Sequence, residues 1–460
     1  MKRRNLIKSL GFGTALSATG LGGLFSNTDV EKAMANVNRH SEPSQLKITD
    51  LRVVRMGPSS WKRYVIRLDT NQGISGYGEV RDGASPTYAL FLKSRILGEN
   101  PCNVDKIFRK IKQFGHHARQ AGGVVSIEIA CWDLAGKAWG VPCWQMLGGK
   151  FRDKIRVYTD TTSNRDPQIM GKRLKERIEH GFTFLKMDVG IGILKGIEGT
   201  ITAPRGMTET HNVAHPFTGI RITEKGLKVF QDYCATIRDI VGWEIPIAVD
   251  HFGHFVLEDC IKIAQALDKF NLAWYEDMIP WQYTDQYVKL RNACTTPILT
   301  GEDIYLKEGF MDLFEKKAIA ICHPDLATAG GLLETKKIGD LAMEHGISMA
   351  LHMAGSPVTL FASVHAAAAT ENFLVMEHHN IDDDWYDELV DNVKKPLVQD
   401  GYVPVPDSPG LGVELNEDAI KKHLKDEGYF EPTPDWDKEK SWDRLWSDSQ
   451  HKNIRHKKLS

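Results

Sequence analysis

Six acidic or histidine residues recur along this chain, each at the end of an apolar run that is typical of a β-strand. They are Asp250, Glu276, Glu302, Asp325, His352 and Glu377. Neighbouring members lie about 25 residues apart, close to the roughly 30 residues of a strand with its crossover helix. Because the carboxyl ends of parallel barrel strands converge on one mouth, we expect these side chains to meet in space. Three carboxylates there suit a hard divalent cation, and a histidine beside an aspartate suits proton transfer.

Acidic residues also follow strands for a simpler reason, as N-caps of the next helix. Glutamate is not a favoured N-cap residue, however, and the run has no gap. The pattern therefore favours one shared site over six separate caps.

The elements that must position these residues can be read from the hydrophobic pattern. Residues 46–56, 62–70 and 74–80 alternate apolar and polar side chains with a turn signal at 71–73, which predicts an antiparallel meander. Residues 87–148 follow with helical spacing, so an α+β segment precedes the barrel. The segment 189–226 is too long for a simple βα loop, and we expect either a loop that shapes the substrate site or an exposed surface loop.

Several motifs give the chain a close resemblance to the enolase superfamily, in the branch of mandelate racemase, muconate lactonizing enzyme and the acid-sugar dehydratases. They are SIEIACWDLAGKAWGVPCWQMLGG (126–149), LKMD (185–188), AVDHFGH (248–254), WYEDMIPW (274–281), TGEDIY (300–305), HPDLATAGG (323–331) and ALHMAGSP (350–357). The resemblance implies an α+β capping domain at 46–150 and a modified TIM barrel, (β/α)7β, at 151–380. Residues 381–460 are expected to pack back on the cap.

The resemblance also implies roles for individual residues. Asp250, Glu276 and Glu302 would bind one Mg2+ ion per subunit. His352 would be the general base that removes the proton α to a carboxylate, with Asp325 as its partner. Glu377 would act as a protonated acid that hydrogen-bonds the intermediate.

In a β-strand, side chains two residues apart lie on the same face. In Lys186-Met187-Asp188, Lys186 and Asp188 therefore share a face, and both are expected at the site. The racemase pattern has a second lysine where this chain has Asp188. A carboxylate is a far weaker base than a neutral lysine, so elimination with a single base is favoured over racemisation. Lys186 would then neutralise the substrate carboxylate.

Four alternatives follow for the function. The first is a Mg2+-dependent dehydratase that converts a sugar acid to a 2-keto-3-deoxy acid. Cycloisomerisation of an anhydro sugar acid comes next, and epimerisation or racemisation third. A sugar-acid binding protein without turnover is disfavoured because binding alone does not need the His352 and Asp325 pair.

Other candidates carry weaker signals. His254 or His251, after the first metal ligand, could protonate a leaving group, and Trp281 could contact the substrate. His323 is interpreted as structural. The last set, His116, His117 and Arg119, could reach the distal end of the substrate.

The composition limits the kinds of molecule that the protein is expected to bind. The chain has 460 residues and a net charge of −2, which gives no basic field for nucleic acid. No long apolar run that predicts a membrane span follows the N-terminus, and we expect a homo-oligomer that acts on a small carboxylate. Residues 1–35, with paired arginines (Arg3, Arg4), a mild apolar stretch and Ala33-Met34-Ala35, resemble a twin-arginine export signal, so we expect a periplasmic enzyme.

Overall fold

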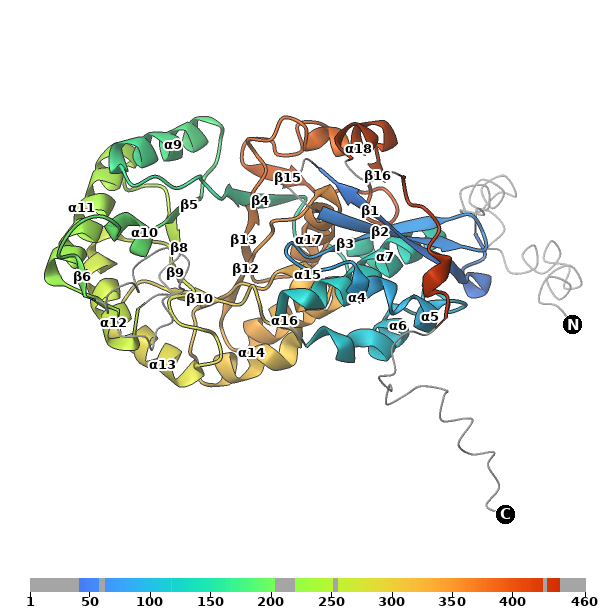
Figure 1. Cartoon of the computed structure of the whole chain (residues 1–460), viewed down its shortest axis with the longest axis horizontal. Helices are drawn as coiled ribbons and strands as arrows, with labels where there is room; N and C mark the ends of the chain where they lie inside the picture. The colour runs from blue at the N-terminus through green and yellow to red at the C-terminus, as the bar shows by residue number, and fades with distance from the viewer. Residues whose placement is uncertain are drawn as a thin grey trace, which may run out of the picture. The chain divides into compact units, whose positions relative to one another are not determined.

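The described part of the chain contains two main β-sheets with helices packed around them (Figure 1). The structure, a computed structural model, describes residues 41–57, 63–116, 118–202, 220–250, 255–424 and 428–438. A three-stranded sheet has the order β1-β2-β3, and a curled nine-stranded sheet has the order β15-β4-β13-β12-β11-β10-β9-β8-β5. Residues 1–35 lie outside the described residues.

The curled sheet is the predicted barrel. Its parallel strands are β4 (Lys154–Thr159), β5 (Leu185–Asp188), β8 (Ile247–Asp250), β9 (Tyr275–Glu276), β10 (Ile298–Thr300), β11 (Ile321–Cys322), β12 (Ser348–Leu351) and β13 (Phe373–His378). The helices that connect them are α9 (Pro167–Glu179), α11 (Glu224–Val241), α12 (Leu257–Leu267), α13 (Thr284–Ala293), α14 (Leu306–Glu315), α16 (Leu332–Glu344) and α17 (Pro357–Ala369). This alternation confirms the predicted (β/α)7β architecture.

The hydrogen-bonded sheet does not close between β4 and β5. Strand β15 (Tyr402–Pro404) pairs antiparallel with β4, and β5 ends the sheet on the other side. The Arg156 side chain spans this opening and donates to Thr183 Oγ1 and to the Thr183 carbonyl, at 2.8 and 2.6 Å. The first two barrel strands are therefore linked through a side chain.

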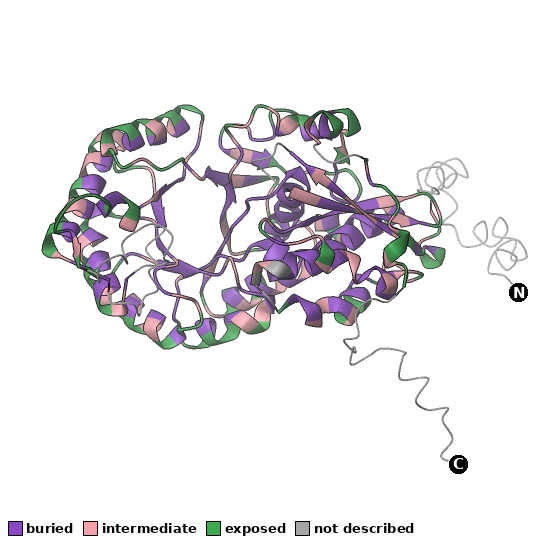
Figure 2. Cartoon of the chain, viewed as in Figure 1, coloured by how far each residue is buried: buried purple, intermediate pink, exposed green. Residues whose placement is uncertain are grey.

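The barrel strands are buried, whereas the surrounding helices have exposed outer faces (Figure 2). Inside the barrel, Trp274 packs against Tyr158 and Phe184, with ring centroids 5.7 and 4.8 Å apart. These rings belong to a buried cluster with Ala248, Leu299 and Val375. Because side chains fill the interior, a ligand can reach the barrel only at a mouth.

The N-terminal segment is the predicted meander with helices on one face. Its strands are β1 (Ile48–Met56), β2 (Arg63–Thr70) and β3 (Ser75–Val80), and its helices are α4 (Thr87–Leu90), α5 (Lys93–Ile96), α6 (Val104–Ile111), α7 (Gly122–Trp139) and α8 (Cys143–Met146). Helix α7 lies close to β3 because β3 carries glycines there. A Cβ atom at Gly78 would stand only 1.9 Å from the Ser126 carbonyl oxygen.

Two buried carboxylates join this segment, the cap, to the barrel. Glu79 of β3 accepts hydrogen bonds from Ser356 N at 2.8 Å and from Thr359 Oγ1 at 2.6 Å, at the first turn of α17. Glu128 of α7 accepts a hydrogen bond from Leu332 N at 3.0 Å, at the start of α16. Both side chains accept hydrogen bonds from N–H groups that a helix leaves without a partner at its N-terminus.

Shorter elements complete the chain. They are α10 (Ile191–Leu194), β6 (Ile201–Thr202), β7 (Arg221–Ile222), α15 (Leu326–Ala329), β14 (Val390–Asp391), β16 (Glu414–Leu415) and α18 (Glu417–His423). Strands β6 and β7 pair at the base of the predicted insertion, whose centre lies outside the described residues. Near the C-terminus, Thr433 donates to the Leu51 carbonyl and accepts from Lys93 Nζ at 3.1 Å, so this part contacts the cap. Among the residues that the structure describes, no helix has both the length and the apolar character needed to span a bilayer.

Candidate active site

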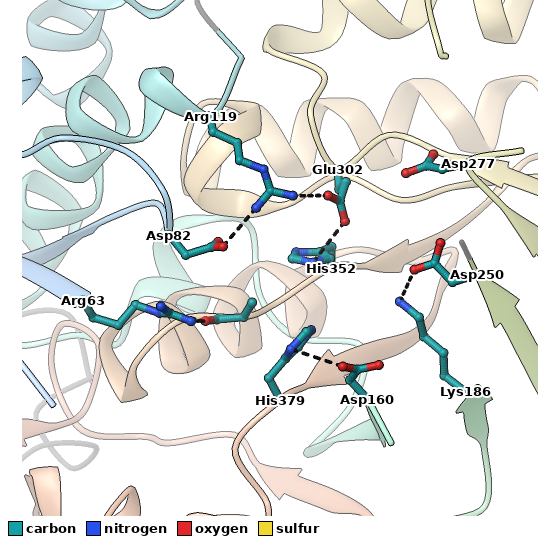
Figure 3. A pocket seen from close by; sticks show the side chains of 11 residues that line it. Arg63, Asp82, Arg119, Asp160, Lys186, Asp250, Asp277, Glu302, His352 and His379 are labelled. Atoms are coloured by element: carbon teal, nitrogen blue, oxygen red, sulfur yellow. Dashed lines mark hydrogen bonds and ion pairs between the residues drawn. The ribbon is translucent and has the colours of Figure 1, made fainter. Parts of the chain in front are cut away.

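A polar cavity of about 470 Å³ lies where the cap meets the carboxyl ends of the barrel strands. Figure 3 shows its side chains converging from both parts of the molecule. The lining residues are Arg63, Asp82, Arg119, Asp160, Lys186, Asp250, Asp277, Glu302, His352, Ala354 and His379. Almost all of these side chains can carry charge, so the cavity suits a small, charged and hydroxylated ligand better than an apolar one.

His352 and Asp325 form a hydrogen-bonded pair in this cavity. They follow the neighbouring strands β12 and β11 and are joined by a parallel β-bridge, which brings the two side chains together. His352 Nδ1 lies 2.7 Å from Asp325 Oδ2, and Asp325 is buried. Asp325 is itself held by Thr328 N and by Arg81 Nη1, each at 3.1 Å. The ring orientation is therefore fixed with Nε2 directed toward Glu302 Oε2, 3.1 Å away.

Lys186 lies deep among three carboxylates. Its Nζ atom is 2.9 Å from Asp250 Oδ2, 2.9 Å from Glu377 Oε1 and 3.5 Å from Glu276 Oε1. Burial lowers the pKa of Lys186, but the charges of Asp250, Glu276 and Glu377 outweigh it and hold the pKa well above its ordinary value. Lys186 is therefore an ammonium ion in the free pocket.

The carboxylates at the strand ends bring oxygen ligands together in a way that suits a cation. Glu276, Asp277 and Glu302 each offer a ligand oxygen, and these atoms lie within 4.8 Å of one another. Asp250 is joined to Glu276 through the ammonium of Lys186, which both carboxylates contact. The donor set consists of hard carboxylate oxygens, which is what Mg2+ prefers, so these residues fit the ion that the sequence implied. Asp277 was not among the predicted ligands.

Two buried side chains of the barrel interior contact the Glu276 carboxylate. Trp274 Nε1 donates to Glu276 Oε2 at 2.9 Å, and His323 Nδ1 lies 3.0 Å from Glu276 Oε1. The other ring nitrogen of His323 lies 3.1 Å from the Tyr158 hydroxyl. Burial lowers the pKa of His323, but the Glu276 charge outweighs it and raises the pKa to about 9. His323 thus orients Glu276 from inside the barrel, as its structural interpretation expected.

Glu377 is fully buried between three cationic or ionisable partners. Its Oε2 lies 3.5 Å from His352 Nε2, and its Oε1 contacts Lys186 and His379. Burial raises the pKa of Glu377, but Lys186, followed by His352 and His379, outweighs it and brings the pKa well below its usual range. In the free pocket Glu377 is therefore a carboxylate, and its role as a protonated acid toward a bound intermediate stays a prediction.

A second histidine, His379, lies beside His352. Its ring centroid is 5.6 Å from that of His352, and its Nε2 is 3.3 Å from Glu377 Oε1. Its Nδ1 is 3.6 Å from Asp160 Oδ2. The register of β13 on β4 pairs His378 with Thr159, so the next residue of each strand, His379 and Asp160, meets at the mouth.

The cap closes the pocket with basic residues. Arg119 of the 3-10 helix Ala118–Ala121 contacts Glu302 and Asp82, the latter at 3.0 Å. Arg63, at the start of β2, donates from Nε to the Ala354 carbonyl at 2.9 Å. Burial raises the pKa of Glu302, but His352, Arg81 and Arg119 outweigh it and lower the pKa to about 2.

Some predicted residues lie elsewhere. Asp188 lines a separate cavity with Asn164 and Gly190 and is not among the pocket residues. Trp281 lines a side cavity of about 330 Å³ that shares Asp277 and Glu302 with the pocket.

Among the other histidines that the sequence suggested, His116 is exposed and its ring packs against Tyr305. His117, His251 and His254 lie outside the described residues.

Two pocket residues beyond the predicted set, Asp160 and His379, carry a signal in the sequence. Asp160 follows the apolar run KIRVYT in the same way as the six strand-end residues. His379 lies two residues after Glu377, so strand alternation places both on one side. Arg63 and Asp82 reach the pocket only through docking of the cap, and the sequence carries no local signal for that.

Comparisons with known proteins agree on one family. A family model described as "Enolase C-terminal domain-like" matches residues 170–419, and one described as "Mandelate racemase / muconate lactonizing enzyme, N-terminal domain" matches residues 20–148. A D-xylonate dehydratase of Haloferax volcanii is 32% identical over 389 residues, which cover 82% of this chain and 89% of that protein. A D-galactarolactone cycloisomerase of Agrobacterium fabrum is 24% identical over 375 residues, covering 77% of this chain and 89% of that protein. The solved structure of a mandelate racemase/muconate lactonizing enzyme-like protein from Rubrobacter xylanophilus is similar with a TM-score of 0.74 and 28% identity, covering 84% of this chain and 99% of that one.

Proposed function

We propose, from the premise that the chain belongs to the mandelate racemase/muconate lactonizing enzyme branch of the enolase superfamily, that it eliminates water from an aldonic acid to give a 2-keto-3-deoxy acid. The chain is a lyase: it belongs to this family, and its relatives are named sugar-acid dehydratases. The D-xylonate dehydratase of Haloferax volcanii makes a five-carbon aldonate the first substrate to try.

One observation carries this proposal. His352 is tied through Nδ1 to the buried Asp325 at 2.7 Å and presents Nε2 to a charged pocket that also contains Lys186. A histidine that donates through Nδ1 can accept a proton at Nε2. In the free pocket Nε2 lies 3.1 Å from Glu302 Oε2, and it would become available when Glu302 binds the cation instead. The pair thus has the arrangement of a general base with an orienting carboxylate.

The other residues of the pocket support the same chemistry. Lys186 would bind the substrate carboxylate, since its ammonium is buried and already surrounded by anions. Asp250, Glu276 and Glu302 would hold Mg2+, with Asp277 beside them. When bound, this ion would stabilise the negative charge that develops on the carboxylate oxygens as the α-proton leaves.

The position of Asp188 supports elimination over racemisation. Racemisation needs a second base on the opposite face of the α-carbon, and in this chain Asp188 lines a neighbouring cavity. Lys186 is an ammonium ion in the free pocket and is assigned here to the substrate carboxylate. A single base at His352 suffices to remove the α-proton for elimination.

Cycloisomerisation is the second candidate. A relative named D-galactarolactone cycloisomerase covers most of the chain, and the same base would begin that reaction. The two reactions differ in the leaving group, which is a ring oxygen in one case and a hydroxyl in the other.

The test is a screen of the purified, Mg2+-loaded protein against a panel of aldonic, aldaric and anhydro sugar acids, with detection of 2-keto products. We expect one or a few aldonates to give a 2-keto-3-deoxy acid, and the His352→Asn variant to give none. Conversion of anhydro sugar acids alone would replace dehydration with cycloisomerisation. Binding of an acid without any conversion would leave only the binding-protein alternative.

We further propose that residues 1–35, which lie outside the described residues, act as a twin-arginine export signal. The support is the pair Arg3 and Arg4 followed by an apolar stretch and a small-residue site. Changing both arginines to lysine should retain the protein in the cytoplasm of an expressing bacterium. Equal periplasmic amounts of the two forms would overturn this.

A further inference from the structure

The described pocket contains a second histidine–carboxylate pair that the proposed base chemistry does not use. His379 follows β13 and Asp160 follows β4, and Nδ1 of the histidine lies 3.6 Å from the aspartate. Their side chains are 29% and 32% exposed, so both are open to the pocket, whereas His352 and Asp325 are nearly buried at 6% and 1%. In both pairs a carboxylate faces Nδ1 of the histidine, as a hydrogen bond at 2.7 Å in the first and as a longer ion pair in the second. Figure 3 shows His379 and Asp160 facing each other near His352.

Elimination of water needs a proton donor as well as a base. Hydroxide is a poor leaving group, so the C–O bond breaks readily only if the oxygen receives a proton. Sugar-acid dehydration therefore moves two protons, one away from the α-carbon and one onto the β-oxygen.

The geometry suits one histidine for each proton. The carboxylate of Glu377 lies between the rings, with His352 Nε2 at 3.5 Å from one oxygen and His379 Nε2 at 3.3 Å from the other. The ring centroids are 5.6 Å apart and the planes are tilted by 55°. Two rings at this separation can each come within a hydrogen bond, about 2.6–3.2 Å, of atoms on adjacent carbons.

We propose that His379, aligned by Asp160, is the acid that protonates the departing β-hydroxyl, while His352 takes the α-proton. This inference rests on the proposed dehydratase function. His379 begins as the imidazolium and donates its Nε2 proton to the β-oxygen. The C–O electron pair leaves with that oxygen as water, and the C–H electron pair forms the C–C double bond of an enol.

The enol becomes the 2-keto acid when it gains a proton at the β-carbon and loses its hydroxyl proton. His352 carries the proton from the α-carbon, and His379 regains its own from solvent. The sum is one sugar acid converted to one keto acid and one water. No oxidant, reductant or further reactant is needed.

Neighbouring charges are consistent with an imidazolium at this position. Burial lowers the pKa of His379, but the Glu377 carboxylate, its hydrogen bond and Asp160 outweigh it, so the pKa is raised from its ordinary value. Asp160 is a positioning residue in this scheme, because it touches His379 and not the reacting atoms.

The test separates the two proton transfers in the His379→Gln variant of the full-length, Mg2+-loaded enzyme. In deuterated water, α-hydrogen exchange of the substrate reports the base, and formation of keto acid reports the whole elimination. We expect α-hydrogen exchange in the variant, whether or not the wild-type enzyme releases labelled substrate, while keto acid forms at least about 10²-fold more slowly, the usual lower contribution of a general acid. Persistent exchange also shows that the variant is folded and binds its substrate.

A substrate analogue with fluorine in place of the β-hydroxyl tests the acid role directly. Fluoride leaves without prior protonation, so His379→Gln should eliminate it at a rate within about 10-fold of the wild-type rate. Asp160→Asn should also slow dehydration and spare elimination of fluoride, with a smaller loss of rate than His379→Gln. The loss should appear as a lower kcat with an unchanged KM. His345→Gln, the same change at the end of α16, is the matched control and should behave as wild type.

Three outcomes would overturn the inference. Normal dehydration by His379→Gln would leave it without a role, and loss of both exchange and elimination would make His379 a binding residue or part of the base. Failure of the fluoro analogue to recover the rate would exclude an acid role. If the wild-type enzyme itself neither exchanges nor eliminates any sugar acid, the proposed function fails first and the inference falls with it.

Discussion

Replacing Asp325 by asparagine should disable the proposed base, His352, while keeping the size and shape of the side chain at position 325. In the native pocket, Asp325 Oδ2 accepts from His352 Nδ1 at 2.7 Å and contacts Arg81 Nη1 at 3.1 Å, while Oδ1 accepts from Thr328 N at 3.1 Å. Three donors therefore point at two acceptor oxygens. An asparagine has only one oxygen, and its NH2 group cannot accept from any of them.

Either orientation of the new amide has a cost. If its oxygen faces Thr328 N, the NH2 group meets His352 and Arg81, and the imidazole must switch to the tautomer that places its proton on Nε2. His352 could then no longer accept the α-proton. If the oxygen faces His352, the NH2 group meets the Thr328 N–H, two donors oppose each other, and Thr328 N keeps only its hydrogen bond to the backbone carbonyl of residue 325 at 3.0 Å.

The expected loss in kcat is about 10²–10⁴-fold, the range for a general base. At 1.36 kcal/mol per decade this is roughly 3–5 kcal/mol of transition-state stabilisation. KM should change little, because the substrate carboxylate is assigned to Lys186. The assay is steady-state kinetics of both proteins on the same sugar acid at saturating Mg2+, with urea unfolding in parallel.

Asp133→Asn is the matched control. Asp133 is also fully buried, pairs with Lys137 at 2.9 Å and accepts from Leu411 N, but it lies on α7 outside the pocket. It should lower the free energy of unfolding and leave kcat unchanged. Near-normal turnover by Asp325→Asn, with normal metal content, would refute the reasoning and give the base role to another residue.

Three further predictions follow from the same structure. Lys186→Ala should raise KM and lower kcat together, each by about 10-fold or more, because it removes the proposed partner of the substrate carboxylate; steady-state kinetics would show an unchanged KM if the carboxylate binds elsewhere. Chelation with EDTA should abolish turnover and Mg2+ should restore it, while Glu302→Gln should need more Mg2+ for half-maximal rate; full activity after verified metal removal would contradict a metal site. Burial lowers the pKa of His365 to about 4, and its Nδ1 accepts from Trp144 N at 3.2 Å, so only the unfolded chain binds a proton there between about pH 6.5 and pH 4. Stability should therefore be complete above that window and fall by up to about 3 kcal/mol as the pH decreases through it. Urea midpoints measured from pH 7 to pH 4.5 should fall less in His365→Gln, and an equal fall in both proteins would contradict this assignment.

The fold and the centre of the site were predictable because both depend on one regular repeat. Each strand of a parallel barrel ends at the same mouth, so an apolar run followed by an acidic residue or histidine gives position as well as identity. His352 and Asp325 meet for this reason, as do Lys186 and Asp250, whose strands pair residue by residue.

The structure differs from the sequence expectations where the repeat stops. Asp188 is the last residue of β5 and pairs with Asp250, yet it lines a neighbouring cavity. Asp277 has a φ of 45°, outside the strand region, which brings it beside Glu276 and Glu302 although alternation would separate it from Glu276.

The ionisation of Glu377 and the arginines of the cap depend on contacts between distant segments. Glu377 meets Lys186 and His379 only once the barrel has formed, and Arg119 reaches Glu302 only when the cap docks. Sequence spacing within one strand contains no information on either contact.

The central claim, elimination with a single base, is tested most directly by a proton NMR time course of the Mg2+-loaded enzyme with D-xylonate, or with the best acid from the screen, in deuterated water. We expect a 2-keto-3-deoxy product, and recovered substrate that is either unlabelled or carries deuterium with its α-configuration retained. An α-epimer that forms as fast as any keto acid would contradict the account and identify the enzyme as an epimerase.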